Sequence, residues 1–308
     1  RFVDMVLDLG ADGIRADVAT IKPFSFWVEI INYTRDKNPE FLYLAEASDS
    51  WREPPSKYAP FTPYDKLLEA GFDGYYGSFF NLKDWKTSSE LMEHIKFNNK
   101  LLSSYSEGKS AILSFTTHDE VSPILLHGKE FSKMICWLEG TLPFNPYIID
   151  GFTTGEDYLY PLSNTKAEKT YTDDDYYFVH RGKLDIFNFT GKPNGKYPEI
   201  AGEYKKAIEF RHNYQNIIAI GNFVPLKADF DNIFAYARCY EGETIIVMGN
   251  LDYDKSFKKV SVRISGMNKK YKIDLINNHS EIKQKRGKLI TDFNPGEIKV
   301  LHIKDFSI

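Results

Sequence analysis

The chain has 308 residues, enough for about two domains at the usual ~150 residues per domain and for a sizeable hydrophobic core. Hydrophobic residues make up 42% of the chain and charged residues 27%. This composition excludes the disordered and collagen-like classes. No apolar run approaches the roughly 18 residues that a membrane span needs, so the integral membrane class is excluded as well. The 39 basic and 43 acidic residues give a formal net charge of −4, which argues against a dedicated nucleic-acid-binding protein.

Helical and strand patterns alternate in the first half of the chain. Phe2, Val3, Val6 and Leu7 are spaced for one buried face and predict the end of an amphipathic helix, which Gly10 terminates. An alternation of this kind indicates a parallel sheet with covering helices. The predicted strands are 13–17, 41–46, 72–75, 110–115 and 146–149, and the predicted helices lie around 26–31, 64–69, 88–105 and 130–138.

Short runs of β-branched and aromatic residues replace this alternation from about residue 222. Turn residues separate them, which is typical of a small all-β sandwich domain, and a predicted helix at 203–214 joins the two parts. The basic cluster 283–286 is interpreted as a solvated hairpin. Cys136 and Cys239 match no metal-ligand spacing and are interpreted as buried thiols. The predicted strands here are 233–240, 244–248, 259–264, 271–275 and 298–303.

Three strands of the first part end in carboxylates: Asp17, Glu46 and Asp119. The carboxyl ends of parallel strands face one shared mouth, so these acids are expected to converge there. Like charges and desolvation raise the pKa of at least one such acid, which makes it suitable as a general acid. Arg15 precedes Asp17 by two residues on the same side of its strand and is expected to hold Asp17 ionised and oriented.

Each of these residues also has a structural interpretation. An acid at a strand end often caps a helix or lies in a solvated loop, and Asp17 precedes a predicted helix. His118 taken alone resembles a structural histidine. A metal site at His118, Asp119 and Glu120 lacks a second histidine at ligand spacing, so no metal site is predicted. The joint occurrence of acids at three strand ends is what favours catalysis.

At these residues the sequence resembles the α-amylase family, family 13 of the glycoside hydrolases. The matching blocks are Gly13–Asp17, Leu44–Glu46 and Phe115–Asp119, in the family's order, with weaker similarity at 70–73, 147–156 and 204–221. The resemblance implies a partial TIM (β/α)8 barrel, strands four to eight, in residues 1–221, and the family's β-sandwich domain C in residues 222–308.

The resemblance also implies roles for individual residues. Asp17 matches the nucleophile, Glu46 the general acid/base and Asp119 the acid that stabilises the transition state. Arg15 matches the arginine beside the nucleophile, and His118 matches a histidine that contacts the sugar. Lys22, Trp51 and Tyr75 are further candidates for substrate binding, the two aromatic rings by stacking on glucosyl units, with packing between sheet and helices as their alternative.

Some features of the family are missing from this sequence. The first three strands, the first conserved block and the loop domain that usually carries calcium are absent, so no cofactor is expected in this segment. The sequence leaves the calcium requirement open, and any calcium site is expected in the missing N-terminal part. Residues 18–22 lack the family's Lys-His pair, and residues 22–27 resemble the maltosyltransferase branch. Strands four to eight without the first three are expected to be inactive and poorly soluble, because the sheet keeps two unpaired edges.

The leading interpretation is a retaining hydrolase of α-glucosidic bonds in starch-like or glycogen-like glucans or maltooligosaccharides. An α-glucan transferase remains open, and so does a non-catalytic glycan- or partner-binding protein. The expected partner is a glucan or oligosaccharide, with no nucleic acid and no membrane span. The sequence assigns neither a compartment nor an oligomeric state.

Overall fold

The computed structural model divides the chain into two compact units. One comprises Arg1–Phe79 with Ile95–Ser114, and the other comprises Phe80–His94 with Phe115–Ile308. No helix among the described residues is long and apolar enough to cross a membrane. The residues that the structure describes are 1–48, 54, 59–105, 108–117, 121–149, 151–155, 197–277 and 280–308.

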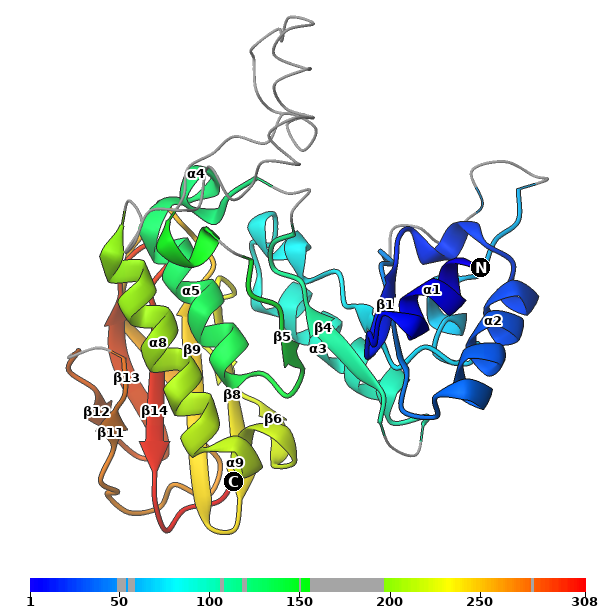
Figure 1. The fold of residues 1–308 in the computed structure, drawn as a ribbon. Coiled ribbons are helices and arrows are strands. Elements are labelled where there is room, and N and C mark those ends of the chain that lie inside the picture. Colours follow the sequence, from blue (N-terminus) through cyan, green and yellow to red (C-terminus); the bar gives the residue numbers. More distant parts are fainter. Residues whose placement is uncertain are drawn as a thin grey trace, which may run out of the picture. The chain divides into compact units, whose positions relative to one another are not determined.

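A parallel sheet forms the centre of the first unit (Figure 1). Its strands lie in chain order: β1 (Gly13–Ala16), β2 (Leu42–Ala45), β3 (Gly74–Tyr76) and β4 (Ser110–Leu113). The register of β1 on β2 runs from Gly13 opposite Leu42 to Ala16 opposite Ala45. Parallel strands in chain order need a crossover between each pair, which agrees with the predicted α/β alternation.

Helices and short turns make the crossovers. Helix α1 (Phe2–Asp8) precedes β1, and η1 (Ala19–Ile21) with α2 (Phe24–Lys37) connects β1 to β2. The indole of Trp27 on α2 packs edge-on against Phe72 at a centroid distance of 4.9 Å, and its Nε1 donates to the carbonyl of Ala19 at 2.8 Å. This contact fixes the start of α2 over the sheet. The remaining elements up to β4 are η2 (Tyr64–Lys66), η3 (Phe79–Lys83) and α3 (Ser88–Leu102).

Two long helices of the second unit, α5 (Gly128–Thr141) and α8 (Pro198–Asn213), lie side by side (Figure 1). Gly140 allows this approach, because a Cβ there would lie 2.9 Å from the carbonyl oxygen of Ala207. Arg211 on α8 donates to the carbonyls of Glu139 and Leu142 at 2.8 Å and thereby caps the end of α5. The smaller elements of this part are α4 (Pro123–Leu126), β5 (Asn145–Pro146), η4 (Phe152–Thr154) and α9 (Gln215–Ala219).

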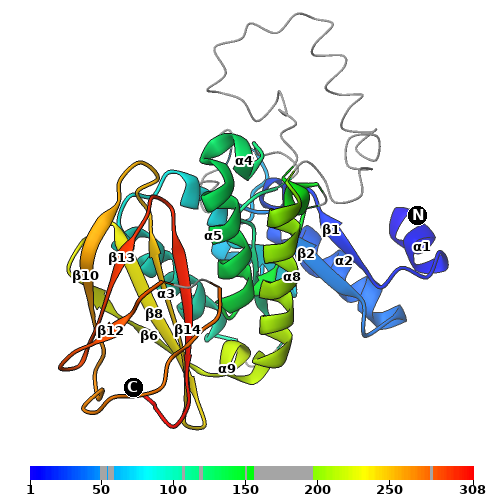
Figure 2. The ribbon, with the colours of Figure 1, turned by 90° about the vertical axis from the view of Figure 1, so that its left-hand side faces the viewer.

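Two antiparallel sheets pack face to face in the C-terminal part (Figure 2). Buried aliphatic residues from both sheets, including Ile246, Val262 and Leu301, form one core between them. One sheet has the order β11 (Asp274–Leu275), β14 (Ile298–Ile303), β9 (Glu243–Asn250), β8 (Ile233–Tyr240) and β6 (Asn222–Pro225). The other has the order β12 (Lys283–Gln284), β13 (Lys288–Phe293), β10 (Phe257–Arg263) and β7 (Lys227–Ala228).

The predicted class, a parallel α/β sheet followed by a β-sandwich, is confirmed. The predicted boundary between residues 221 and 222 coincides with the start of β6, whereas the contacts group α5, α8 and the sandwich into one unit. The reason is packing: α5 contacts β14, and α9 contacts β8 and β9. The boundary between the two expected domains therefore stays a prediction.

Candidate active site

Asp17 and Glu46 follow directly on neighbouring parallel strands. Asp17 comes after β1 and Glu46 after β2, and the last residues of these strands, Ala16 and Ala45, are register partners. The backbone N–H of Glu46 donates to the carbonyl of Ala16 at 2.9 Å, which extends the pairing past the strand ends. The two carboxylates therefore come from adjacent positions at the carboxyl edge of the sheet.

The guanidinium group of Arg15 connects the two acids. Its Nη1 donates to Oδ1 of Asp17, and its Nη2 lies 2.6 Å from Oε1 of Glu46, as an ion pair without the alignment of a hydrogen bond. The ring of Tyr76, at the end of β3, lies with its centroid 5.8 Å from the Arg15 guanidinium carbon. Burial lowers the pKa of Arg15, but hydrogen bonds to Tyr76 and Asp17 and the charge of Glu46 outweigh it and raise the pKa above its usual value. Arg15 thus stays cationic between the carboxylates.

The Glu46 side chain is held at both oxygens. While Oε1 faces Arg15, Oε2 accepts a hydrogen bond from the backbone N–H of Val18 at 2.8 Å. Val18 adopts a left-handed conformation, with φ 40° and ψ 55°, and this conformation directs its N–H to the carboxylate. The side chain of Glu46 is 11% exposed and that of Asp17 is 78% exposed. One acid is therefore enclosed and oriented, and the other is open to a ligand.

Lys22 lies on the same connection as Asp17, between η1 and α2, and is exposed. Its carbonyl accepts a hydrogen bond from Oγ1 of Thr62 at 2.6 Å, and the N–H of Thr62 donates to the carbonyl of Thr20 at 2.8 Å. These bonds fix the backbone of the loop that carries both Asp17 and Lys22. The position of Lys22 is compatible with the predicted role in substrate binding.

Tyr75 lies in the core of the first unit and not on its surface. Its ring is fully buried, packs edge-on against Tyr64 at 5.1 Å, and its hydroxyl donates to Oδ1 of Asn98 at 2.7 Å. Burial raises the pKa of this phenol. Side chains alternate along a strand, so Tyr75 and Tyr76 face opposite sides, and Tyr75 takes the side that packs on α3. A stacking contact between Tyr75 and a sugar is therefore not proposed further.

Asp119, His118 and Trp51 lie outside the described residues, so their predicted roles stay predictions.

The hydrogen bond from the Val18 N–H to Glu46 could not be predicted from the sequence, because a β-branched residue gives no signal for a left-handed backbone. Within the described part of the chain, no three His, Cys, Asp or Glu side chains are close enough to bind a metal ion together.

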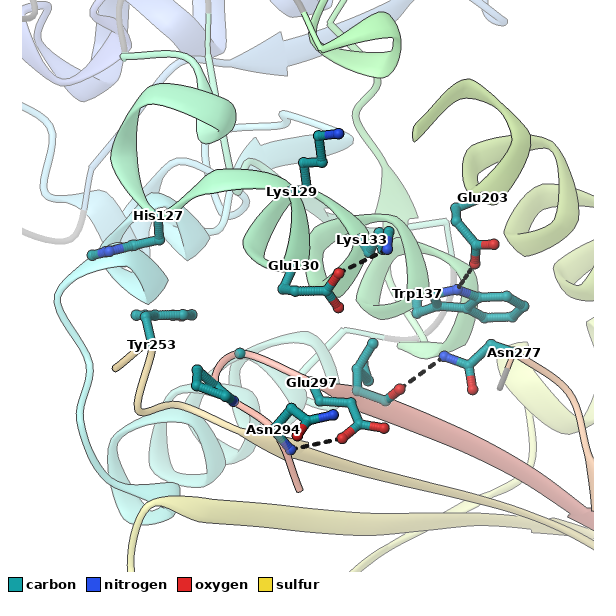
Figure 3. Close-up of a pocket in the computed structure, with 13 residues that line it drawn as sticks. His127, Lys129, Glu130, Lys133, Trp137, Glu203, Tyr253, Asn277, Asn294 and Glu297 are labelled. Carbon is teal, nitrogen blue, oxygen red and sulfur yellow. Dashed lines mark hydrogen bonds and ion pairs between the residues drawn. The ribbon is translucent and has the colours of Figure 1, made fainter. Parts of the chain in front are cut away.

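A separate hollow of about 590 Å³ lies in the second unit, between α5, α8 and the turn that joins β13 to β14 (Figure 3). Its polar groups are largely paired with one another. The pairs are Glu130 with Lys133, Trp137 Nε1 with Glu203 and the N–H of Asn294 with Glu297. Such pairing leaves few groups for a ligand, so the strand-end acids of the first unit are the better candidate.

Comparison with known proteins agrees with this architecture. No protein-family model matches the chain. Over 266 residues it is 23% identical to the alpha-1,4-glucan:maltose-1-phosphate maltosyltransferase of Corynebacterium glutamicum, an alignment that covers 86% of this chain and 35% of that protein.

Solved structures match nearly the whole chain. The alpha-amylase of Geobacillus thermoleovorans, in complex with acarbose, superposes with a TM-score of 0.68 at 16% identity, over 99% of this chain and 62% of that one. The maltogenic alpha-amylase AmyB of Thermotoga neapolitana gives 0.66 at 16% identity, over 99% and 65%. The chain has an alpha-amylase fold.

The resemblance found in the sequence blocks is thus confirmed for the fold. A cyclomaltodextrinase shares this alpha-amylase fold as well, with a TM-score of 0.67 at 16% identity, over 98% of this chain and 47% of that one. The chain spans about a third of the length of its curated relative and about two thirds or less of these solved structures. Within the alpha-amylase fold, the strands that carry Asp17 and Glu46 are adjacent, as the sequence blocks predict.

Proposed function

We propose that the protein acts on α-glucosidic bonds of glucans or maltooligosaccharides by a retaining double displacement. The observation that carries this proposal is the arrangement at the ends of β1 and β2, where Arg15 links Asp17 to Glu46. Because both acids contact one guanidinium group, we expect their carboxyl groups to have the roughly 5–5.5 Å separation typical of retaining glycosidases. Asp17, the exposed acid, is the nucleophile, and Glu46, the enclosed acid, is the general acid/base.

In the first step, the Asp17 carboxylate attacks the anomeric carbon while the Glu46 carboxylic acid gives its proton to the glycosidic oxygen. The bond between the anomeric carbon and this oxygen breaks, and the leaving sugar departs with the proton. Arg15 holds the Asp17 side chain and prevents it from turning away, since one guanidinium group contacts the side chains of both acids. Asp119 and His118 are proposed to contact the reacting sugar.

In the second step, Glu46 removes a proton from an incoming acceptor, which displaces Asp17 from the anomeric carbon. Water as the acceptor gives hydrolysis, the leading proposal. A sugar hydroxyl or phosphate as the acceptor gives transfer. Transfer is the second candidate because the sequence relative is described as a maltosyltransferase and residues 22–27 resemble that branch.

Product analysis on maltoheptaose separates these proposals. The full protein is incubated with maltoheptaose, with and without inorganic phosphate, and the products are separated by chromatography. Shorter sugars alone indicate hydrolysis, whereas longer sugars or a sugar phosphate indicate transfer. The absence of any product in both incubations would contradict catalysis and favour a glycan-binding protein.

The stereochemistry gives an independent check on the mechanism. Proton NMR of the fresh product, recorded before mutarotation, is expected to show the α-anomer, because two inversions at one carbon give net retention. A β-anomer as the first product would rule out Asp17 as a covalent nucleophile.

A further inference from the structure

A second hollow, of about 500 Å³, lies in the sandwich domain between the turn that follows β10 and the turn that joins β12 to β13. Its lining contains four cationic side chains and no carboxylate. The cations are Lys269, Lys270, Lys285 and Arg286. Two come from each turn, so the fold brings together charges that are about 15 residues apart in the sequence.

Hydrogen bonds hold the two turns together. The side-chain amide of Gln284 accepts from the N–H of Tyr271 at 2.9 Å and donates to the carbonyl of the same residue at 2.5 Å. The N–H of Ile264 donates to the carbonyl of Gly287 at 2.8 Å, and the buried Met267 anchors the first turn in the sandwich core. These bonds therefore hold the backbone of both turns, from which the four cationic side chains extend.

Some exposed lysines of this domain have acidic partners. Lys258 pairs with Asp292 at 3.3 Å, and Lys272 pairs with Asp274 at 3.3 Å. The four cations of the hollow form no ion pair within the described residues, and Lys269 lies over the ring of Tyr271 at 5.1 Å. Like charges in one hollow repel one another and attract an anion. The lining of the hollow is thus positively charged, whereas the chain as a whole has a net charge of −4.

We infer that this hollow binds a phosphate group, carried by a phosphorylated sugar or glucan or present as free phosphate. A guanidinium fork with lysines around it suits the oxygens of a phosphate, and the cations are confined to one hollow and form no track for a nucleic acid. The sugar as carrier rests on the proposed function, whereas the phosphate contact rests on the four cations alone.

Titration calorimetry on the full protein tests the site with three probes: glucose 6-phosphate, inorganic phosphate and glucose. The double variant Lys285→Gln with Arg286→Asn removes two of the four charges. Asn is chosen because residue 286 has a positive φ of 48°, which Asn tolerates. The matched control is Lys205→Gln with Lys206→Gln, which removes two exposed charges from α8.

Both phosphate probes are expected to bind and glucose is not, and binding is expected to weaken by about tenfold or more in the double variant but not in the control. Tighter binding of glucose 6-phosphate than of inorganic phosphate identifies a phosphorylated sugar as the ligand, and equal binding identifies free phosphate. The inference fails if no phosphate probe binds or if the control weakens binding equally. Because the readout is binding, a protein inactive on maltoheptaose that still binds phosphate disproves the proposed function and not this site.

Discussion

At the scale of single residues, β1 carries an aspartate at each end. Asp17 follows the strand at the edge with Arg15 and Glu46, and Asp12 precedes it at the opposite edge, where it is exposed. The two aspartates provide a matched pair of variants. The same Asp→Asn change is made at both ends of β1, but only Asp17 has a proposed catalytic role.

Asp17→Asn is expected to lower kcat on maltoheptaose by about three orders of magnitude or more, since the amide cannot form the glycosyl intermediate. Asp12→Asn is expected to leave kcat within about threefold of the unmodified protein. Steady-state kinetics of both variants, with circular dichroism to check folding, measure the difference. A folded Asp17→Asn protein that keeps more than about a tenth of the activity would show that Asp17 is not the nucleophile.

Glu139, in the last turn of α5, is a buried acid whose carboxylate lacks a hydrogen-bond partner among the described residues. Its side chain is fully buried, and within the described part of the chain neither carboxylate oxygen has a hydrogen-bond partner. Burial raises the pKa of Glu139 well above its usual range, against the opposing charge of Arg211, and burial likewise raises the pKa values of Cys136 and Tyr204. The native state therefore holds Glu139 protonated.

The sign of the pH dependence follows from this proton. The unfolded chain releases it above a pKa near 4.5 and the native state retains it, so the stability contributed by the neutral acid is lost as pH rises from about 5. Glu139→Gln is expected to flatten this loss, by up to about 1.4 kcal/mol for each pH unit over which the two states differ by one proton. Urea unfolding between pH 5 and 8 measures it, with the exposed Glu209→Gln as control. Equal pH slopes for the Glu139→Gln and unmodified proteins would contradict a protonated Glu139.

At the scale of secondary-structure elements, Asp73 connects four of them at the amino edge of the sheet. It directly precedes β3, and its Oδ2 accepts from Arg35 on α2 at 2.7 Å and from the N–H of Tyr43 on β2 at 2.8 Å. Its Oδ1 lies 3.6 Å from Nζ of Lys109, just before β4. Burial lowers the pKa of Lys109, and the charge of Arg35 adds to this effect, while Asp73 opposes both. The carboxylate thus offsets two neighbouring cations.

Asp73→Asn is expected to lower the free energy of unfolding by about 1–3 kcal/mol, because it removes the charge that compensates Arg35 and Lys109. The active-site acids lie at the other edge of the sheet, so kcat of the folded variant should not change. The exposed Asp65→Asn is the control, and urea denaturation gives the comparison. If both variants lose equal stability, the Asp73 cluster does not hold the sheet together.

The strands that could be predicted from the sequence are those with an unbroken β-branched or aromatic pattern. Residues 233–240 and 298–303 are β8 and β14 with the predicted bounds. The sequence does not predict strand β13, because polar residues such as Lys288 and Asp292 interrupt its pattern and its pairing to β10 is a long-range contact. Tertiary packing decides such strands.

The candidate site shows the same division between local and long-range information. The positions of Arg15, Asp17 and Glu46 follow from strand ends, which local pattern locates within a residue or two. The hydrogen bond from the N–H of Val18 to Glu46 depends on a backbone conformation 28 residues away that no side chain encodes. The burial of Tyr75 depends on which face of β3 meets α3, and a three-residue strand has too short a pattern to fix that face.

At the scale of the whole molecule, the two kinds of sheet differ in how well their hydrogen bonds are protected. Strand β9 is bonded on both sides, to β8 and β14, and all its residues but the first are buried. Strand β1 is bonded to β2 alone among the described strands, and only its last residue is buried. Amides open most easily where few buried contacts cover them.

Hydrogen exchange followed by mass spectrometry is therefore expected to be slowest in peptides from β8 and β9 and faster by orders of magnitude in peptides from β1. Strand β2 provides the internal control, because it is as short as β1 but bonded on both sides. Protection of β1 equal to that of β9 would mean that the edge of β1 is covered.

The left-handed turn at Val18 has a consequence for how ready the site is before any substrate arrives. A β-branched residue with positive φ is disfavoured by about 1–2 kcal/mol or more, and such a conformation persists only where its surroundings over-determine it. Here two hydrogen bonds hold this conformation: the N–H of Val18 donates to the Glu46 carboxylate, and the N–H of Ala19 donates to the Glu46 carbonyl. The entropy of ordering the carboxylate is thus lost once, during folding, and not again with each bound glucan, which is the meaning of preorganisation in a catalytic centre.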